Sequence, residues 1–190
     1  MAVSAVGAAA LAAAAPPGAG ESMLLRLLKH LTATTARTRL LFSPGVLTQI
    51  ESAVAQAEAQ HTGEIRFAIE TALPLPAIWQ GVTPRARALQ AFSHLRVWDT
   101  HGNNGVLIYV LRADRAVEIV ADRGISARVS EGEWQALCRE IEALFRENRY
   151  AQGSVAAVDG VAKLLRTHFP SGGPSGGEGS NELPNQPVLL

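Results

Sequence analysis

The sequence of 190 residues has one cysteine, Cys138, and few aromatic residues, which make up 5% of the chain. A single cysteine excludes an intramolecular disulfide and any zinc or iron–sulfur site that needs several cysteines. The three tryptophans do not follow one strand with basic residues between them, so no stacking platform for nucleic-acid bases is visible. Basic and acidic residues number seventeen each, which gives a formal net charge of 0. We therefore expect no nucleic-acid partner, because the chain has no overall attraction to a phosphate backbone.

Several catalytic and membrane patterns are also missing. The sequence contains no G-x-S-x-G, Walker A or G-x-G-x-x-G motif, so serine hydrolase, P-loop and dinucleotide-binding functions have no support. His94 and His101 lack a third ligand at a recognised spacing, which disfavours zinc. The alanine-rich start has no positive n-region, and its apolar run of about 15 residues is shorter than a membrane span. We therefore expect no signal peptide or transmembrane helix, and a location in the cytoplasm or at the periphery of a membrane.

Composition divides the chain into four parts. Its 47% content of hydrophobic residues is typical of a globular protein with a core. Residues 1–22 are expected to be a disordered alanine-rich extension, and residues 171–190 a disordered Gly/Ser/Pro tail. Residues 23–42 form a basic amphipathic segment, and residues 43–170 form the folded domain.

The segment 23–42 places five leucines between basic side chains, which predicts a short helix with one apolar stripe. It contains four basic residues and no acidic one, whereas the domain from 43 to 170 has thirteen basic and fourteen acidic residues. Two interpretations stay open. The leucines dock on the following domain, or the segment lies on an anionic membrane surface.

The domain is expected to be a compact α/β sandwich, with a small mixed sheet packed by about four helices. Strands are predicted near 64–70, 105–112 and 115–122, because the first and third alternate polar and apolar residues and the second is continuously apolar. The second and third strands form an antiparallel hairpin. Helices are expected after Ser43-Pro44, Thr83-Pro84, the capping pair Ser130 and Glu133, and Gly153.

This order of elements predicts a polar site at one edge of the sheet. If the strand at 64–70 runs parallel to the strand at 105–111, their N-terminal ends share an edge, and the hairpin returns to it. The predicted metal ligands at this edge are Glu64, Asp99, Asn103, Asn104 and Asp122. Carboxylate and amide oxygens suit Ca²⁺ or Mg²⁺. Arg66, Arg96 and Arg123 are near enough in sequence to clamp a phosphate or carboxylate, with Arg123 and Arg96 as the candidates for phosphate binding.

The loop from Asp99 to Gly105 has an alternative explanation, because Asp, Asn and Gly are also the residues that favour tight turns. It is not an EF-hand loop. Asn104 stands where the sharp-turn glycine belongs, and no glutamate follows eleven residues after Asp99. The same residues therefore suit a looser cation site or a plain turn.

These segments resemble the TPM domain. The resemblance covers residues 44–169 and rests on three stretches, IESAVAQAEAQHTGEIRFAIE, RALQAFSHLRVWDTHGNNGVLIYVLRADRAVEIVADRGI and FRENRYAQGSVAAVDGVAKLL. It implies a compact α/β sandwich, a divalent-cation site in some members, and acid phosphatase activity that is reported for some. By position it points to Asp99, Asn103, Asn104 and Asp122. Many members have Gly-Tyr-Gly or similar where this chain has Asp122-Arg123-Gly124, so the site chemistry can differ.

Three functions follow from these patterns. The first is a divalent-cation-binding or scaffold module with a protein partner, linked to the assembly or maintenance of membrane proteins. The second is a metal-assisted acid phosphatase, in which Asp99 or Asp122 holds the metal and Arg123 or Arg96 contacts phosphate. No residue stands out as its nucleophile. The third is attachment to a membrane surface through residues 23–42.

Overall fold

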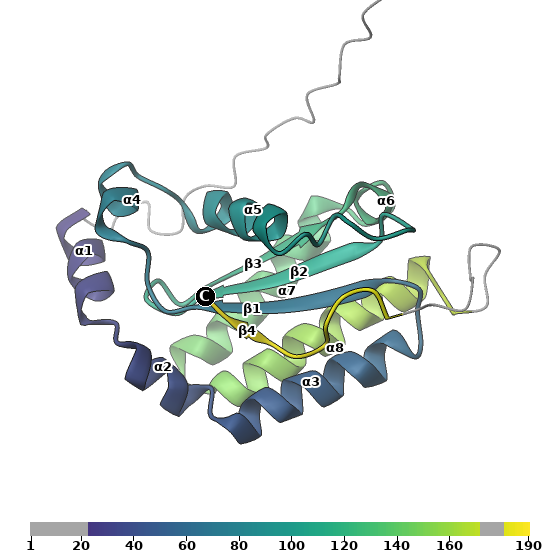
Figure 1. The fold of residues 1–190 in the computed structure, drawn as a ribbon, viewed down its shortest axis with the longest axis horizontal. Coiled ribbons are helices and arrows are strands. Elements are labelled where there is room, and N and C mark those ends of the chain that lie inside the picture. Colours follow the sequence, from purple (N-terminus) through teal and green to yellow (C-terminus); the bar gives the residue numbers. More distant parts are fainter. Residues whose placement is uncertain (1–22, 172–180) are drawn as a thin grey trace, which may run out of the picture.

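A four-stranded mixed sheet lies at the centre of this computed structural model, which describes residues 23–171 and 181–190 (Figure 1). The strands are β1 (Glu64–Glu70), β2 (Gly105–Leu111), β3 (Ala116–Ala121) and β4 (Val188–Leu189), in the order β3-β2-β1-β4. β1 is parallel to β2 and to β4, and β2 is antiparallel to β3. The predicted α/β class, the parallel pair and the hairpin are confirmed.

Two apolar cores lie on opposite faces of this sheet. Every residue of β2 is buried, as its continuous apolar run predicts. On β1, Ile65, Phe67 and Ile69 belong to the larger core, and Ala68 faces the smaller one. Side chains alternate between the faces of a strand, so a sheet covered on both sides needs apolar residues at successive positions.

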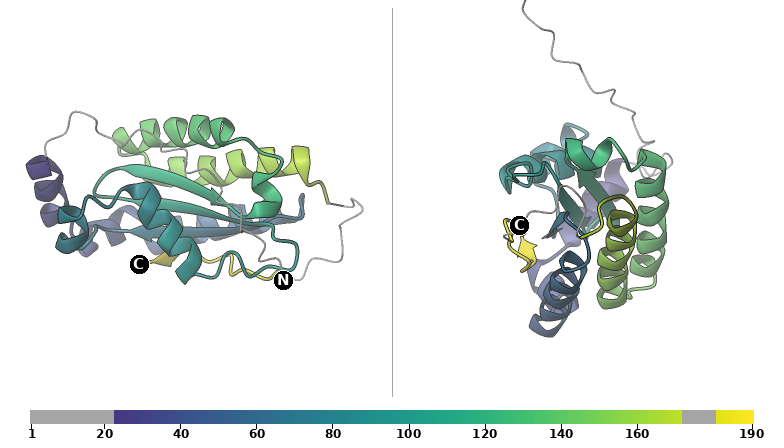
Figure 2. Two further views of the ribbon diagram at one scale, coloured as in Figure 1. Left: turned by 90° about the horizontal axis from the view of Figure 1, so that it is seen from above. Right: turned by 90° about the vertical axis from the view of Figure 1, so that its right-hand side faces the viewer.

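Helices cover both faces unequally (Figure 2). The larger core is closed by α3 (Pro44–Glu58), α7 (Glu131–Arg146) and α8 (Tyr150–His168), and the smaller core by α4 (Leu75–Trp79) and α5 (Pro84–His94). α6 (Arg123–Ser126) is one short turn after β3. α4 and α6 were not expected from the sequence. α8 also begins three residues before Gly153, so this glycine lies inside the helix. A side chain at this position would collide with the Phe145 ring, so glycine allows the helix to pack beside it.

The N-terminal segment forms two helices, α1 (Met23–Thr32) and α2 (Thr35–Leu41), rather than one. Leu27 packs against the smaller core, but Leu24, Leu28 and Leu31 are between 49% and 65% exposed. The interpretation in which the leucine stripe docks on the domain is therefore wrong for most of the stripe. No helix among residues 23–171 and 181–190 is long and apolar enough to cross a membrane.

The expected disorder of residues 171–190 is wrong for residues 181–190. This stretch runs beside β1, where β4 pairs with Ala68 and Ile69, and Leu190 donates its backbone N–H to the Ile69 carbonyl. Leu183 is only 6% exposed and joins the smaller core. A short polar tail can order itself when a sheet edge offers it unpaired backbone groups. The expected extension 1–22 and residues 172–180 lie outside the described residues.

Candidate cation site and polar clusters

The loop before β2 and the turn after β3 meet at one end of the sheet. The Asp122 N–H donates to the Gly105 carbonyl at 2.9 Å, and the Gly124 N–H donates to the Asn103 carbonyl at 3.1 Å. Asn103 has a φ of 49°, in the left-handed region that asparagine tolerates. The Arg123 Nη2 donates to the Asn103 Oδ1 at 2.5 Å. Four predicted site residues, Asn103, Asn104, Asp122 and Arg123, are thus brought to one place.

Two oxygen atoms at this place have no hydrogen-bond partner among the described residues, although both are buried. They are the Asn104 Oδ1 and the Asp122 Oδ2. The rest of each side chain is engaged, because the Asn104 Nδ2 donates to the Thr62 carbonyl and the Asp122 Oδ1 accepts from the Arg123 N–H at 2.7 Å. Buried acceptors are nearly always satisfied, so each of these two oxygens needs a donor or a cation.

Asp99 and Glu64 are occupied by other groups. The Asp99 carboxylate is half exposed and lies 3.3 Å from the Arg96 Nη2. Glu64 is 8% exposed, and its Oε2 accepts from the Leu183 N–H at 3.2 Å. Burial raises the pKa of Glu64, partly offset by this bond. Within residues 23–171 and 181–190, no three His, Cys, Asp or Glu side chains are grouped closely enough to hold a metal ion.

The predicted phosphate clamp has internal partners. Arg96 pairs with Asp99 and Arg123 with Asn103. Arg66 donates from its Nη1 to the Pro184 and Gln186 carbonyls, both at 2.6 Å. The last contact was invisible in the sequence, because nothing in the composition of the tail indicated that it returns to β1.

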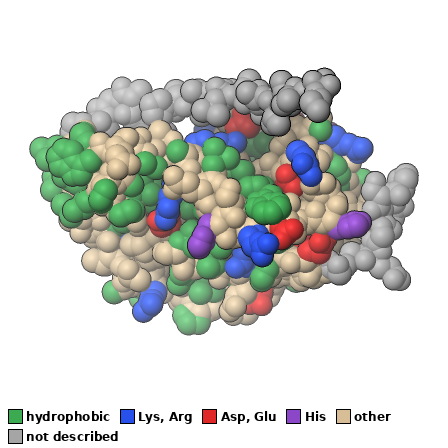
Figure 3. Space-filling view, turned by 45° about the horizontal axis from the view of Figure 1, so that its top comes forward, with side chains coloured by type: hydrophobic (Ala, Val, Ile, Leu, Met, Phe, Trp, Pro, Cys, Tyr) green, Lys and Arg blue, Asp and Glu red, His purple; other side chains and the backbone are tan. Residues whose placement is uncertain are grey.

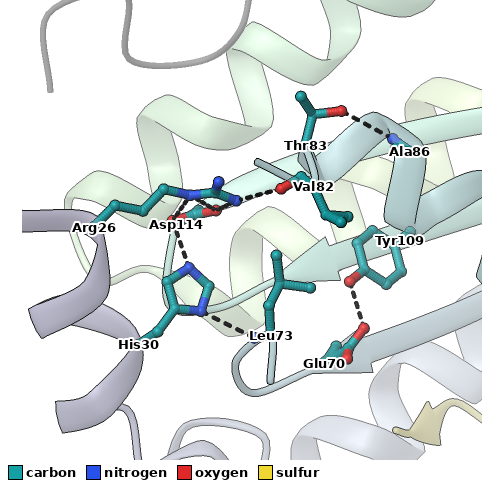
Figure 4. Close-up of polar contacts among 9 residues, drawn as sticks. All are labelled: Arg26, His30, Glu70, Leu73, Val82, Thr83, Ala86, Tyr109 and Asp114. Carbon is teal, nitrogen blue, oxygen red and sulfur yellow. Dashed lines mark hydrogen bonds and ion pairs between the residues drawn. The ribbon is translucent and has the colours of Figure 1, made fainter. Parts of the chain in front are cut away.

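A second polar cluster lies at the opposite end of the sheet, where the β2–β3 hairpin meets α1 (Figure 4). The Asp114 carboxylate accepts from the Arg26 Nη2 at 2.9 Å and from the His30 Nε2 at 2.9 Å. The His30 Nδ1 accepts the Leu73 N–H at 2.9 Å, so the neutral ring carries its proton on Nε2 and donates it to Asp114. Burial raises the pKa of Asp114, but the bonds from His30 and Arg26 outweigh it and hold the pKa below the ordinary value.

Glu70 anchors a third cluster under α5. The Tyr109 hydroxyl donates to the Glu70 Oε2 at 2.6 Å, and the Arg87 Nε donates to the same oxygen at 2.8 Å. Burial, followed by the bond to Glu70, raises the pKa of Tyr109. Every donor and acceptor in these bonds is matched, which indicates a structural role for this cluster.

The orientation of α1 leaves an apolar surface at the same end of the molecule. Its polar residues Arg26 and His30 point inward to Asp114, so its leucines other than Leu27 are exposed. The exposed apolar residues of α1 and α4 gather at one end of the space-filling view (Figure 3), and they are Met23, Leu24, Leu25, Leu28, Leu31, Leu75 and Trp79. A groove of about 230 Å³ between the two helices has an almost wholly apolar lining.

Comparisons with known proteins agree with this architecture. The sequence profile of the TPM domain matches residues 37–164. The NMR structure of the BA42 protein from the psychrophilic bacterium Bizionia argentinensis is 28% identical, with a TM-score of 0.66, and the match covers 78% of this chain and 94% of that one. The N-terminal domain of the cg2496 protein from Corynebacterium glutamicum shares the fold at 17% identity, with a TM-score of 0.50 and coverage of 72% and 80%. No curated protein sequence matches significantly.

Proposed function

Because the chain belongs to the TPM-domain family, we propose that it is a binding module that takes up a divalent cation between Asn104 and Asp122. The observation that supports this proposal is the pair of buried oxygens, Asn104 Oδ1 and Asp122 Oδ2, that have no partner among the described residues. An amide and a carboxylate oxygen are hard ligands, and Ca²⁺ or Mg²⁺ completes its shell with backbone carbonyls and water. The residues present therefore fit a cation of this class.

Asp99 is the third ligand in this proposal. It belongs to the same loop and is exposed, so it can exchange Arg96 for a cation at little cost, because exposed ion pairs contribute about 1 kcal/mol or less. Glu64 has weaker support, because its carboxylate is buried against the Leu183 backbone.

A titration with Ca²⁺ and with Mg²⁺, followed by amide NMR, tests the cation site. We expect shifts confined to residues 99–105 and 122–124. Asp122→Asn is the informative variant, because asparagine also caps a helix and keeps the turn while it removes the charge. We expect it to weaken binding about tenfold or more, since a bond to a charged group contributes about 1.5–3 kcal/mol. Asp159→Asn on α8 is the exposed control. No shift at millimolar cation would remove the site.

The phosphatase alternative has less support in the geometry. Arg96 and Arg123 are both bonded to side chains of the same loop, so a phosphoryl group would compete with Asp99 and Asn103 for them. A phosphomonoester assay decides this point. Hydrolysis that disappears in Asp122→Asn and in Arg123→Met, but persists in Asp159→Asn, would replace the binding proposal with an enzyme.

A second role, attachment to an anionic membrane surface, is favoured by the orientation of α1, which we call inverted because polar side chains face the domain and most leucines face solvent. Arg26 and His30 bind Asp114, the exposed leucines lie on the outer side, and residues 23–42 contain no acidic side chain. Apolar insertion beside basic residues is how interfacial helices bind lipid. This surface would place a scaffold module beside membrane proteins.

Liposome flotation of the full chain tests the membrane role. The double variant Leu28→Ser/Leu31→Ser should lower binding to vesicles that contain phosphatidylglycerol, and the fold should persist because both side chains are about half exposed. Leu89→Ser on α5, a leucine that is 42% exposed and lies outside residues 23–42, is the control. Equal flotation of all three proteins would contradict the proposal.

A further inference from the structure

Arg112, the first residue after β2, is buried and unpaired. It opens the turn between β2 and β3, and the residue is 9% exposed. Its Nε and Nη2 atoms are buried and have no hydrogen-bond partner among residues 23–171 and 181–190. A guanidinium keeps its charge at any pH that a protein tolerates, so this is a buried cation with unused donors on two of its three nitrogen atoms.

The nearest charged groups do not compensate Arg112. Burial lowers the pKa of Arg112, and although Tyr150 acts in the opposite direction, the like charges of Arg37 on α2 and Arg115 in the hairpin lower it further. α2 is held beside the hairpin through Thr38, whose hydroxyl accepts from the Thr71 hydroxyl at 3.0 Å, while the Thr71 carbonyl accepts from the Ala113 N–H. Arg37 and Arg115 are therefore near enough to Arg112 for their charges to act on it, and the three arginines define one corner of the fold.

Two residues that neighbour Arg112, Asp114 along the chain and Glu70 across the strand pairing, have carboxylates that are already bonded to other groups. Asp114 stands between Arg112 and Arg115 in sequence, but its oxygens accept from Arg26 and His30. Glu70 accepts the Arg112 backbone N–H through its carbonyl, but its carboxylate is bonded to Arg87 and Tyr109. Neither carboxylate is therefore available to the Arg112 guanidinium.

Arg115 adds a second, independent observation. It has a φ of 51°, at a turn position where glycine or asparagine would be unstrained. The backbone cost of an arginine here is about 1 kcal/mol, and strain of this kind concentrates at functional sites. The side chain is exposed at the rim of the corner, where it can reach a ligand.

We propose that Arg112, Arg37 and Arg115 form a binding site for a phosphate group, with Arg112 as the buried donor and the other two at the rim. Phosphate and guanidinium match in charge and in donor geometry. The source is either the headgroup of an anionic phospholipid or a soluble phosphate. The site is separate from the cation site at the other end of β2, and it stands or falls independently of that site.

Inorganic phosphate, titrated at pH 7.5 against sodium chloride of matched ionic strength, tests the site in the full chain. We expect phosphate to raise the Tm of the wild type. Arg112→Met should weaken phosphate binding about tenfold or more, because a charge-assisted hydrogen bond is lost. It should also raise the Tm in phosphate-free buffer, because an unpaired buried charge is replaced by an apolar side chain of similar length. A folding defect is therefore not the expected cause of lost binding.

Two further variants separate charge from shape and position. Arg115→Asn should weaken phosphate binding while it relaxes the turn, and Arg112→Lys should restore part of the affinity. Arg139→Met, an exposed arginine on α7, is the control and should bind phosphate like the wild type. Two results would overturn a soluble phosphate as the ligand: equal stabilisation of the wild type, Arg112→Met and Arg115→Asn by phosphate, or no stabilisation of the wild type at millimolar phosphate. The site itself is then decided by binding to lipid vesicles.

Vesicles distinguish the two sources. If the ligand is a lipid headgroup, Arg112→Met should lower flotation with phosphatidylglycerol vesicles several-fold and leave phosphatidylcholine vesicles unaffected. If the ligand is a soluble phosphate, flotation should be the same in both proteins while phosphate binding is lost. Flotation and phosphate binding that are both independent of Arg112 would refute the site.

Discussion

Asp114 is the residue that fixes α1 in its inverted orientation, and Asp114→Asn tests this role. The carboxylate accepts from the Arg26 Nε at 3.2 Å, the Arg26 Nη2 at 2.9 Å and the His30 Nε2 at 2.9 Å. Asparagine has nearly the same shape, but it carries no charge, and its NH₂ group would face a donor. The single oxygen can accept from His30, which is 4% exposed, or from Arg26, so one of the two loses its partner, and Arg26 is partly exposed and can regain water.

The size of the effect follows from these exposures. Removing one partner of a buried ion pair costs about 3–5 kcal/mol. We take the lower end, about 3 kcal/mol, because Arg26 can be rehydrated. The measurement is the free energy of unfolding from urea denaturation at pH 7 in the presence of a chelator. Amide hydrogen exchange should show that protection is lost first in α1.

Asp99→Asn is the control for this prediction, because Asp99 also pairs with an arginine at 3.3 Å but is half exposed. It should change the free energy of unfolding by about 0.5 kcal/mol or less. If Asp114→Asn costs less than about 1 kcal/mol, or no more than the control, then α1 is held by its apolar contacts and the argument from the polar face is refuted.

Three other perturbations have defined outcomes. Burial raises the pKa of Glu118 to about 7, from 4.5 in an unfolded chain. The folded state therefore holds the proton more tightly, and the free energy of unfolding falls as the pH rises from 4.5 to 7. Glu118→Gln should reduce this fall by at most about 3 kcal/mol in urea denaturation at several pH values, and an unchanged pH dependence would contradict the prediction. Leu183→Ala should cost about 2 kcal/mol of unfolding free energy, because this tail side chain is 6% exposed, whereas Leu189→Ala, at 39% exposure, should cost little; equal effects would mean that the tail is not docked in solution. A Cβ at Gly105 would overlap the Val97 carbonyl, so Gly105→Ala should lower the thermal midpoint by the equivalent of about 2 kcal/mol or more, while Gly45→Ala, which meets open space in α3, should not lower it.

Local patterns predicted most of the sheet and the principal helices. The continuous apolar run of β2 and the alternation of β1 show whether both faces or one face of the strand is buried. This pattern can be read from consecutive residues, because successive side chains point to opposite faces. The capping box at Ser130 and Glu133 is present as predicted, because both partners lie within one turn. The start of α8 was predicted too late, because glycine disfavours a helix when it is judged from local sequence alone. In the fold, this glycine makes room for the Phe145 ring.

The candidate site was predictable only in part. Asn103, Asn104, Asp122 and Arg123 meet because strand topology brings their segments to one edge. Whether an oxygen there is free or bonded depends on distances of a few tenths of an ångström, which no spacing rule supplies. The hydrogen bond from the Leu183 N–H to the Glu64 carboxylate joins residues that are 119 positions apart in the chain.

The sequence by itself determined the α/β class, the pairing of the central strands and the basic, acid-free character of residues 23–42, because each depends on residues that are neighbours along the chain. The tertiary structure alone decided which face of α1 turns inward, where the tail lies, and that Arg112 is buried without a carboxylate. These outcomes depend on competition among distant partners: Asp114 binds Arg26 and His30, whereas two buried nitrogen atoms of Arg112, two positions away in the chain, have no partner among the described residues.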